Sequence, residues 1–373
     1  MRAIAVSPGA RKVSLVDQPE PRLEDTHDVK LRILEVGVCG TDREICAFDY
    51  GTPPPGSDHL VIGHESLGEV IEVGRDVSRV AAGDIVVPTV RRPCHHRECR
   101  PCQVGRQDFC STGEFQERGI RERHGFMTER IVDHESYMNV VPRALRASAV
   151  LVEPLTIAEK SLLQLAQIQD RLAWGCAHSR TEGPGHCHRA VVLGAGPVGL
   201  LGAMALAVRG FQTTVYSREP ATHAKADLVR SFGGSYVSAS THDVDALASA
   251  VGTIDLVYEA TGISRLAFEV LRHLGANGVL VLTGVPALRG PSPVDTDAIM
   301  RNMVLKNQLV LGTVNSGRDG FEAAIADLGT FDARWPQALS GLITGRVPVE
   351  SYSELLTGPL QGIKNVIAFD GRR

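Results

Sequence analysis

The sequence predicts an α/β protein with two domains: a β-rich N-terminal domain and a second domain built on a doubly wound parallel sheet. Three observations support this fold class. The length of 373 residues suits two domains. Residues 1 to about 155 hold short runs rich in β-branched residues, separated by glycine and proline. From about residue 190, apolar runs alternate with helical stretches, which is typical of a parallel sheet with crossover helices.

In the N-terminal domain, three runs read as strands joined by turns. They are VKLRILEVGVCG (29–40), HESLGEVIEVG (64–74) and AAGDIVVPTV (81–90). Their close spacing leaves little room for helices, so this part is expected to be all-β with irregular loops.

In the second domain, six strand-like runs alternate with helices. They are AVVLGAG (190–196), TTVYS (213–217), SYVSA (235–239), IDLVYEATG (254–262), GVLVLTGV (278–285) and QLVLGTV (308–314). After Ser316 the chain shows a helix-like stretch, DGFEAAIADLG (319–329), and a last strand-like run, IKNVIAFDG (363–371).

Composition and charge exclude several classes of protein. The chain is 43% hydrophobic and 22% charged with a net charge of −4, which gives no electrostatic reason to expect nucleic acid or an anionic membrane as a partner. The N-terminus shows no signal peptide, so a cytoplasmic location is expected. Residues 190–208 lack charge over a length that could span a bilayer, but Gly194, Gly196 and Pro197 interrupt them. A strand, a tight turn and a buried helix explain this segment better.

A glycine-rich loop opens the second domain. Gly194, Ala195, Gly196, Pro197, Val198 and Gly199 fit the pattern G-x-G-x-x-G. Because the loop follows an apolar strand and begins a helix, it predicts a dinucleotide phosphate site at the helix N-terminus. The alternative is a glycine-rich turn without a ligand.

The end of the second strand of this sheet predicts which dinucleotide binds. An NAD-specific fold usually carries an acidic residue there. This chain has Ser217 and Arg218, followed by Glu219 and Pro220, and Pro220 suggests that the chain is already turning away. A hydroxyl and a guanidinium suit a 2′-phosphate, so NADP is expected, with NAD as an alternative.

Cysteine and histidine residues suggest metal sites. Eight cysteines in a chain without a signal peptide favour thiols over disulfides. Cys39, His64 and the neighbouring Glu65 are candidate ligands, and the segment 93–110 holds four cysteines. The segment 173–189 adds Cys176, His178, His186, Cys187 and His188. A metal site is conceivable there, but we expect a solvated insertion, because Gly-Pro-Gly would leave the ligands unfixed.

The order of these motifs resembles the zinc-dependent medium-chain alcohol and polyol dehydrogenases over essentially the whole chain. The motifs are GVCGTD, GHExxGxV, GDxVV, the cysteine cluster and GAGPVG. Finer markers resemble the glucose 1-dehydrogenases of that superfamily: ERGI (117–120), HGF (124–126), EPLTIAEK (153–160), GTVN (312–315) and GPLQGIKNVI (358–367). The resemblance implies a GroES-like β-domain of residues 1–155, joined by 316–373, and a Rossmann NADP-binding domain of residues 156–315.

By this resemblance, the cysteine cluster holds a structural zinc rather than the chemistry. Its ligands would be Cys94, Cys99, Cys102 and Cys110. The first spacing is two residues longer than usual in the superfamily, so His95 or His96 could replace Cys94. A closed shell of four thiolates leaves no room for substrate. The alternatives are four thiols without metal and a nucleic-acid finger, and the charge balance counts against the latter.

The resemblance also implies a catalytic zinc in a cleft between the domains. Cys39, His64 and Glu153 map onto ligand positions, and Glu65 maps onto a carboxylate that joins or adjusts the shell. An open coordination position would accept the alcohol oxygen and favour its deprotonation. Thr41 is expected to pass the proton on, unless it is a plain strand-end hydroxyl.

The same resemblance implies the cofactor and substrate contacts. Further cofactor contacts are expected at Thr283, Gly284, Val285, Thr313, Val314 and Asn315. The sugar hydroxyls would be held by Thr41, Glu117, Glu153 and Asn315. Glu117 could instead pair only with Arg118, Arg121 or Arg123, and Asn315 could cap a turn or contact the nicotinamide. Ile157 stands where glucose dehydrogenases can carry a polar residue, so the preferred sugar could differ from glucose.

The sequence therefore predicts an enzyme that oxidises an aldose, with glucose as the first candidate, at C1 to its lactone. One rival is a zinc dehydrogenase for another sugar, polyol or amino-cyclitol. A rival from another class is a non-catalytic NADPH-binding or metal-sensing protein, and the presence of Cys39, His64, Glu65, Thr41 and Glu153 together argues against it. By resemblance, a homo-oligomer is expected.

Overall fold

The computed structural model describes residues 1–287, 290–359, 361–369 and 371. Leu360 of the GPLQGIKNVI motif lies outside them. The chain divides into two compact units. The first comprises Met1–Thr156, Asn315–Leu328 and Leu342–Arg373, and the second comprises Ile157–Val314 and Gly329–Gly341.

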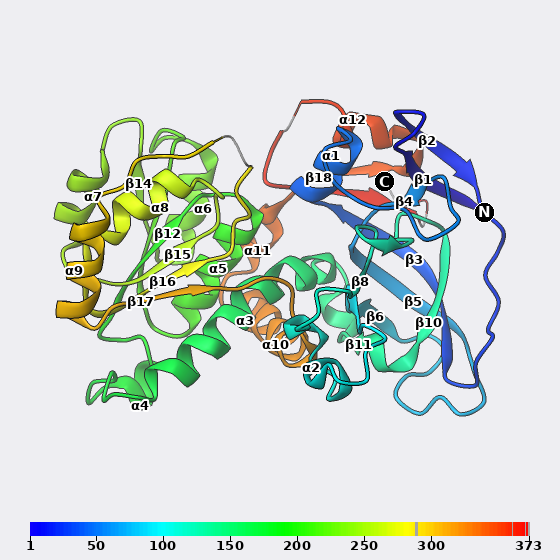
Figure 1. Ribbon diagram of the computed structural model, residues 1–373, viewed down its shortest axis with the longest axis horizontal. Coiled ribbons are helices and arrows are strands. Elements are labelled where there is room, and N and C mark those ends of the chain that lie inside the picture. Colours follow the sequence, from blue (N-terminus) through cyan, green and yellow to red (C-terminus); the bar gives the residue numbers. More distant parts are fainter. Residues whose placement is uncertain (288–289, 360, 370, 372–373) are drawn as a thin grey trace. The chain divides into compact units, whose positions relative to one another are not determined.

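The first unit is built on β-sheets, as its β-branched runs predict, and most of its strand pairs are antiparallel (Figure 1). Its main sheet has the strand order β11-β6-β5-β3-β19-β18, with β10 also paired to β3, and two three-stranded sheets have the orders β2-β1-β4 and β7-β8-β9. The strands are β1 (Arg2–Ser7), β2 (Lys12–Asp17), β3 (Asp28–Val38), β4 (Leu60–Val61), β5 (Glu65–Val73), β6 (Ile85–Pro88), β7 (Arg91–Arg92), β8 (Gln116–Arg118), β9 (Glu122–Arg123), β10 (Arg130–His134), β11 (Met138–Val140), β18 (Ile343–Pro348) and β19 (Lys364–Ala368).

The helices that belong to this unit or cross its limits are α1 (Gly40–Cys46), α2 (Arg100–Gln103), α3 (Val152–Gln169), α10 (Arg318–Arg334), α11 (Pro336–Leu342) and α12 (Tyr352–Leu356). Short 3₁₀ turns span Gln107–Phe109, Glu135–Tyr137, Arg143–Leu145, Ala149–Leu151 and Val349–Ser351. Alternate residues of β3, namely Val29, Leu31 and Ile33, are fully buried, so the core lies against this central strand. The strand β19 pairs antiparallel with β3 and adds the end of the chain to the sheet.

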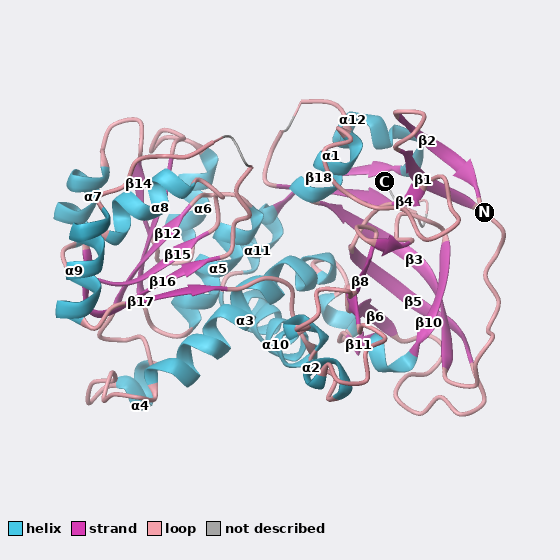
Figure 2. Cartoon of the chain, in the orientation of Figure 1, coloured by secondary structure: helices cyan, strands magenta, loops and turns pink. Residues whose placement is uncertain are grey.

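The second unit is a six-stranded parallel sheet flanked by helices (Figure 2). The strand order β14-β13-β12-β15-β16-β17 is that of a doubly wound dinucleotide-binding fold. Its elements are α4 (Ser179–Glu182), β12 (Arg189–Leu193), α5 (Pro197–Val208), β13 (Gln212–Ser217), α6 (Ala224–Ser231), β14 (Ser235–Ser238), α7 (Val244–Val251), β15 (Ile254–Glu259), α8 (Ser264–Leu271), β16 (Leu274–Leu282), α9 (Thr296–Lys306) and β17 (Leu309–Gly312). All six predicted runs became strands.

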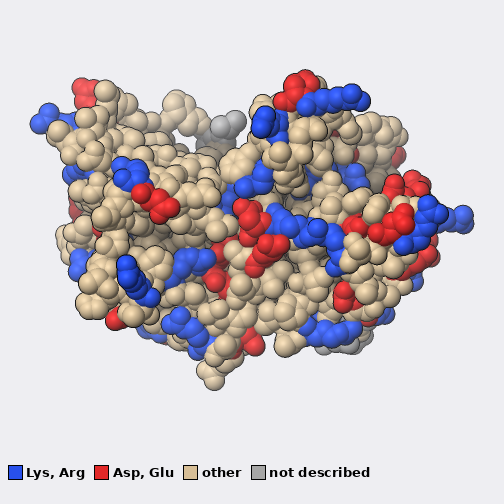
Figure 3. Space-filling view, turned by 90° about the horizontal axis from the view of Figure 1, so that it is seen from below, with Lys and Arg blue, Asp and Glu red and all other residues tan. Residues whose placement is uncertain are grey.

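The predicted fold class is therefore confirmed. The segment 190–208 forms β12 and the buried helix α5. No helix among the described residues combines the length and apolar character needed to cross a membrane. Acidic and basic side chains are interspersed on the face drawn in Figure 3, in keeping with the net charge of −4.

The C-terminal segment is shared between the two compact units. The sequence assigned all of 316–373 to the first domain, whereas residues 329–341 group with the second unit. Trp335 of this segment packs on Phe232 of the second unit, with ring centroids 5.9 Å apart. Helical periodicity gave no sign of where these aromatic partners lie.

The loop before β12 contradicts two further expectations. Cys176 and Cys187 form a disulfide, although the sequence favoured thiols throughout; the other six cysteines take part in no disulfide. The backbone brings the two Cα atoms to 6.2 Å, within the range that a disulfide spans. The loop is also held in place rather than left unfixed, because its glycines allow close packing, as described below.

Candidate metal, cofactor and substrate sites

Cys39, His64 and Glu65 come together in the first unit. Cys39 follows β3 and caps α1, and Glu65 is the first residue of β5, directly after His64. Because β3 and β5 are adjacent antiparallel strands, their ends place one ligand atom from each residue within 4.8 Å of the others. A thiol, an imidazole and a carboxyl at this separation match the donors of a zinc site with an open position.

Asp42 supports His64, a role that the sequence alone did not reveal. Its fully buried carboxyl has Oδ1 3.4 Å from Nδ1 of His64 and accepts hydrogen bonds from the backbone N–H groups of Cys39 and Gly63. Burial alone would lower the pKa of His64, but Asp42 and Cys39 raise it well above its ordinary value. The cluster therefore attracts positive charge, and a carboxylate behind the histidine is the usual partner of a metal-bound imidazole.

Lys364 is the second residue that sequence reasoning missed. Its Nζ lies 2.5 Å from Oε2 of Glu65, and both side chains are only 2% exposed. Lys364 belongs to β19, 299 residues away along the chain. Nothing in the run IKNVI marks one lysine as the partner of a buried carboxylate.

Glu153 lies buried in the first turn of α3. Burial, together with the charges of Glu65 and Asp42, raises its pKa to about 7, against the opposing effects of His64 and Lys364. The acidic groups near this site are the buried carboxyls of Asp42, Glu65 and Glu153 and the thiol of Cys39. The basic groups are the ammonium of Lys364 and the imidazole of His64. A bound zinc ion would balance this excess of acidic groups, so the residues fit the metal.

Thr41 lies in the first turn of α1, two residues after Cys39, and is half-buried. Asp42 fills the neighbouring N3 position and holds the Cys39 backbone, which fixes the start of this helix. Thr41 thus stands on a helical turn whose start is fixed next to Cys39.

The four predicted cysteine ligands of the lobe also converge. Cys94, Cys99, Cys102 and Cys110 place their sulfurs within 4.8 Å of one another. The sulfurs of Cys99 and Cys110 are 3.9 Å apart, close to the roughly 3.8 Å expected between two thiolates on one tetrahedral zinc. Hydrogen bonds from Ser111 and from the backbone of Cys102 lower the pKa of Cys99 to about 5, which favours the thiolate that zinc requires. His96 instead pairs with Glu114 at 2.7 Å.

Glu117 and Asn315 meet in the first unit. Asn315 Nδ2 donates to Oε1 of Glu117 at 3.3 Å, and both residues are buried. Arg91 donates to the same oxygen through Nε and Nη2, at 3.1 and 3.0 Å. Neither Arg118 nor Arg123 is the partner of Glu117, because both turn to the buried Asp133.

Asn315 retains an unused acceptor. Its Oδ1 is buried and has no hydrogen-bond partner among the described residues. A buried acceptor left unpaired costs about 1–3 kcal/mol, so Oδ1 is available to accept a hydrogen bond from a ligand hydroxyl or amine, or from water. Within the described part of the chain, no hydrogen bond or ion pair connects Glu153 to Glu117 or Asn315.

The glycine-rich loop of the second unit has the geometry that its pattern predicts. Gly194 has φ +103°, and a Cβ on Gly199 would lie 2.1 Å from the carbonyl oxygen of Gly194. Gly196 caps α5 and has open space where a side chain would stand, while Ala195, Pro197 and Val198 complete the turn. The N-terminus of α5 can thus receive a phosphate group.

The end of β13 carries Ser217 and Arg218, the residues that the sequence predicts to select the cofactor. Glu219 Oε2 accepts from Ser217 Oγ at 2.5 Å, and Oε1 accepts from Lys225 at 2.6 Å. Burial would raise the pKa of Glu219, but Lys225 and Ser217 lower it to about 2. The carboxylate is therefore neutralised by its own neighbours. Arg218 is exposed, and among the described residues no hydrogen bond or ion pair holds its side chain.

Glu259 organises the other strand ends. This buried residue ends β15, and its Oε1 accepts from the backbone of Thr261 and Gly262, while Oε2 accepts from Gly284. Its carbonyl accepts from the Thr283 hydroxyl. Of the other predicted cofactor residues, Val285 and Val314 are exposed, and Thr313 accepts from Gln164. Glu259 stands in the run IDLVYEATG, and no local pattern there marks it for this role.

Comparisons with known proteins agree with this arrangement. Residues 25–143 match the family model described as alcohol dehydrogenase GroES-like domain, and residues 146–369 match the one described as glucose dehydrogenase C-terminus. A glucose 1-dehydrogenase from Methanocella arvoryzae is 37% identical over 370 residues, covering 98% of this chain and 99% of that protein. One from Thermoproteus tenax is 40% identical over 373 residues, with 98% and 99% coverage.

A solved structure is similar over the whole chain. It is the Haloferax mediterranei glucose dehydrogenase in complex with NADP, Zn and gluconolactone, 32% identical, with a TM-score of 0.87 and 100% coverage of both chains. The chain therefore belongs to the zinc-dependent medium-chain dehydrogenases. The Methanocella arvoryzae and Thermoproteus tenax relatives, which match over nearly the whole chain, are glucose 1-dehydrogenases. The resemblance and the dehydrogenase class predicted from the sequence are therefore confirmed.

Proposed function

We propose that this protein oxidises an aldose, with glucose as the first candidate, at C1 to the lactone, and transfers the hydride to NADP. One observation carries the choice of a sugar: the buried Glu117–Asn315 pair, in which Oδ1 of Asn315 lacks a partner among the described residues. The solved Haloferax mediterranei relative, which holds NADP, Zn and gluconolactone, supports the same choice.

The metal residues would assist loss of the C1 hydroxyl proton. The proposed zinc ligands are Cys39 and His64, whose ligand atoms lie together with that of Glu65, and Glu153, which the family resemblance adds. Glu65, held by Lys364, adjusts the shell. When bound, zinc supplies a Lewis acid for the hydroxyl oxygen and the nicotinamide accepts the hydride. Thr41, on its fixed helical turn, is proposed to carry the proton away. We propose the four-cysteine lobe as a structural zinc site.

The sugar-binding residues would orient the ring. Oε1 of Glu117 accepts the hydrogen bonds from Arg91 and Asn315, which leaves Oε2 to accept a hydrogen bond from a sugar hydroxyl. Asn315 Oδ1 accepts from another. Such fixed contacts confer specificity because a buried group left unpaired costs about 1–3 kcal/mol.

The proposed cofactor preference rests on Arg218 and Lys225. Glu219, which could accept from the ribose 2′-hydroxyl of NAD, is already engaged by Ser217 and Lys225. Arg218 can make charge-assisted hydrogen bonds to a 2′-phosphate. NADP is therefore the proposed cofactor, with NAD as the alternative.

The test of the sugar site is a substrate panel. kcat/KM is measured for glucose, galactose, xylose, a polyol and a simple secondary alcohol in wild type and Glu117→Gln. We expect the substitution to lower kcat/KM for the preferred sugar by about 10- to 100-fold, because hydrogen bonds to charged groups contribute about 1.5–3 kcal/mol. The simple alcohol should change little.

Glu122→Gln is the matched control. Glu122 lies opposite Glu117 in the register of the strand pair β8–β9. Its substitution therefore alters the same small sheet without touching Asn315. The sugar assignment fails if wild type prefers the simple alcohol, or if Glu117→Gln weakens every substrate alike.

We also propose that the protein is a homo-oligomer. The outer face of α9 exposes Met300, Val304 and Leu305, each at least 66% exposed, beside the edge strand β17. An apolar face next to an unpaired strand edge suits contact with a second copy. Light scattering on the eluting protein should give a multiple of 40.1 kDa; a monomer mass at micromolar concentration would reject the proposal. The cytoplasmic location stays a prediction.

A further inference from the structure

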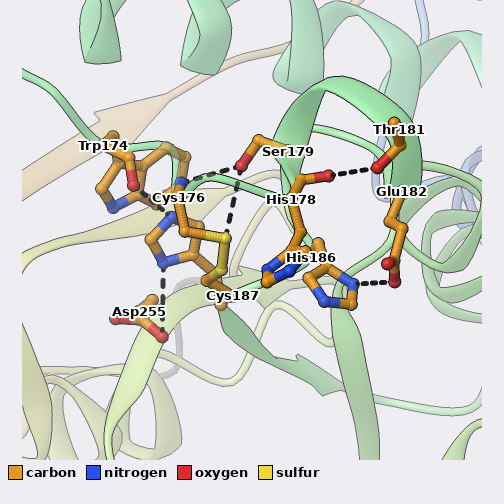
Figure 4. Close-up of a disulfide and its surroundings, with 10 residues drawn as sticks. Trp174, Cys176, His178, Ser179, Thr181, Glu182, His186, Cys187 and Asp255 are labelled. Atoms are coloured by element: carbon orange, nitrogen blue, oxygen red, sulfur yellow. Dashed lines mark hydrogen bonds and ion pairs between the residues drawn. A yellow bond between two sulfur atoms is a disulfide. The ribbon is translucent and has the colours of Figure 1, made fainter.

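The loop between α3 and β12 contains two cysteines and three histidines, and the structure separates their roles (Figure 4). His188 is buried and its ring stacks on Trp174, with centroids 4.2 Å apart. Its Nε2 lies 2.8 Å from the carbonyl oxygen of Trp174, and its Nδ1 lies 3.7 Å from Asp255. Both ring nitrogens are thus engaged, so His188 anchors the loop rather than binding a ligand.

Two glycines hold the loop against the segment 209–211. Gly183 has φ +101°, and a Cβ there would lie 2.4 Å from the carbonyl oxygen of Arg209. A Cβ on Gly185 would lie 2.1 Å from the Phe211 ring, and its N–H donates to Arg209. Side chains at these positions would force the segments apart. The glycines therefore fix the positions of the remaining cysteines and histidines.

The remaining four residues all lie within the segment 176–187. The disulfide joins Cys176 to Cys187, and the imidazoles of His178 and His186 lie on the same side of it in Figure 4, with ring centroids 5.7 Å apart. All four are at least partly exposed. Nδ1 of His186 lies 2.9 Å from Oε2 of Glu182, which leaves Nε2 for another partner. Metal-bound histidines usually show this arrangement of a carboxylate on the second nitrogen.

The spacing suits a tetrahedral ion once the disulfide is reduced. Two thiolates on one zinc lie about 3.8 Å apart, so the sulfurs would separate by less than about 2 Å from their bonded distance. Two imidazoles on one zinc have centroids about 5 Å apart, close to the separation of His178 and His186. Two thiolates and two imidazoles form a closed shell typical of structural zinc.

We propose that this loop is a redox-controlled zinc site, distinct from the two metal clusters of the first unit. In the reduced protein one zinc binds the sulfurs of Cys176 and Cys187 and the imidazoles of His178 and His186. Oxidation to the disulfide removes both thiolates and releases the ion. The loop is thus cross-linked by the disulfide in the oxidised protein and by zinc in the reduced protein.

The redox step balances with a dithiol as reductant. The dithiol transfers two electrons and two protons to the Cys176–Cys187 bond and becomes a disulfide itself. The two new thiols lose their protons when zinc binds, because the metal takes thiolates. A two-electron oxidant reverses the sequence.

The test compares the zinc content of oxidised and reduced full-length protein. One sample keeps its disulfide, and the other is treated with a phosphine, which reduces the bond and becomes a phosphine oxide with oxygen from water. Zn²⁺ is added to both, unbound ion is removed, and zinc per chain is measured by mass spectrometry. We expect about one additional zinc per chain in the reduced sample, as for a single tetrahedral site.

Variants identify the ligands. The His178→Ala/His186→Ala and Cys176→Ser/Cys187→Ser double variants should gain no zinc on reduction, whereas Arg180→Ala, an exposed change within the same loop, should gain it as wild type does. Equal zinc in both forms of the wild type overturns the proposal. A full gain in either double variant also overturns it, because the ion would then be bound by other groups, such as the four-cysteine lobe.

Discussion

Replacing Lys364 by methionine should strongly destabilise the first unit. Lys364 and Glu65 are both 2% exposed and form an ion pair, and Glu153 and Asp42 lie within electrostatic reach. Methionine preserves most of the side-chain volume but leaves the Glu65 carboxylate buried without its cation. Breaking a buried pair in this way costs about 3–5 kcal/mol. At about 2–4 °C per kcal/mol for a unit of this size, Tm should fall by roughly 6–20 °C.

Thermal unfolding followed by circular dichroism, at fixed zinc concentration, measures this effect. Lys30→Met is the matched control, because Lys30 pairs with Glu20 and Glu72, which are 51% and 58% exposed. Surface pairs contribute about 0–1 kcal/mol, so its Tm should change by less than about 4 °C. The double variant Glu65→Gln/Lys364→Met should recover part of the loss. The reasoning is refuted if Lys364→Met melts like Lys30→Met, or if the double variant is less stable than Lys364→Met alone.

Three further predictions concern the metal and cofactor sites. Cys102→Ser should remove one zinc per chain and lower Tm, because structural zinc in finger peptides contributes about 10–16 kcal/mol to folding, while the correctly folded fraction keeps its activity. Zinc analysis and a melting curve check this prediction, and an unchanged zinc content and Tm would contradict it. His64→Ala should reduce turnover by at least about 10³-fold, since Lewis-acid stabilisation supplies several kcal/mol, while NADP binding followed by fluorescence stays as in wild type; turnover near the wild-type value would exclude His64 as a ligand. Arg218→Ala should raise KM for NADP by about 10- to 100-fold and leave KM for NAD nearly unchanged; equal losses for both cofactors would mean that Arg218 has another role.

Much of the fold was readable from local sequence patterns. The six apolar runs of the second unit became β12 to β17, and the loop from Gly194 to Gly199 adopted the turn that its spacing predicts. Strand alternation and glycine requirements act over a few residues, so they leave a direct trace in the sequence. The metal-binding residue types were also visible, because Cys39, His64 and the cysteines of the lobe stand out by their chemistry.

The partners of these residues were decided only by tertiary structure. Lys364 pairs with Glu65 across 299 residues, and Asn315 reaches Glu117 across 198. Residues 329–341 group with the second unit, where Trp335 contacts Phe232. These contacts depend on which strands and helices become neighbours, and no local period records that choice.

The cysteine-containing loop before β12 illustrates the same division. Its composition suggested a flexible insertion because Gly183 and Gly185 flank a proline. In the folded chain the same glycines permit contact with Arg209 and Phe211, which brings Cys176 and Cys187 into bonding range. A glycine codes for the absence of a side chain, and whether that yields mobility or close packing depends on what lies opposite. The sequence by itself thus determined the elements and the reactive groups, and the tertiary structure determined their partners, because buried charges and thiols are paired through space rather than along the chain.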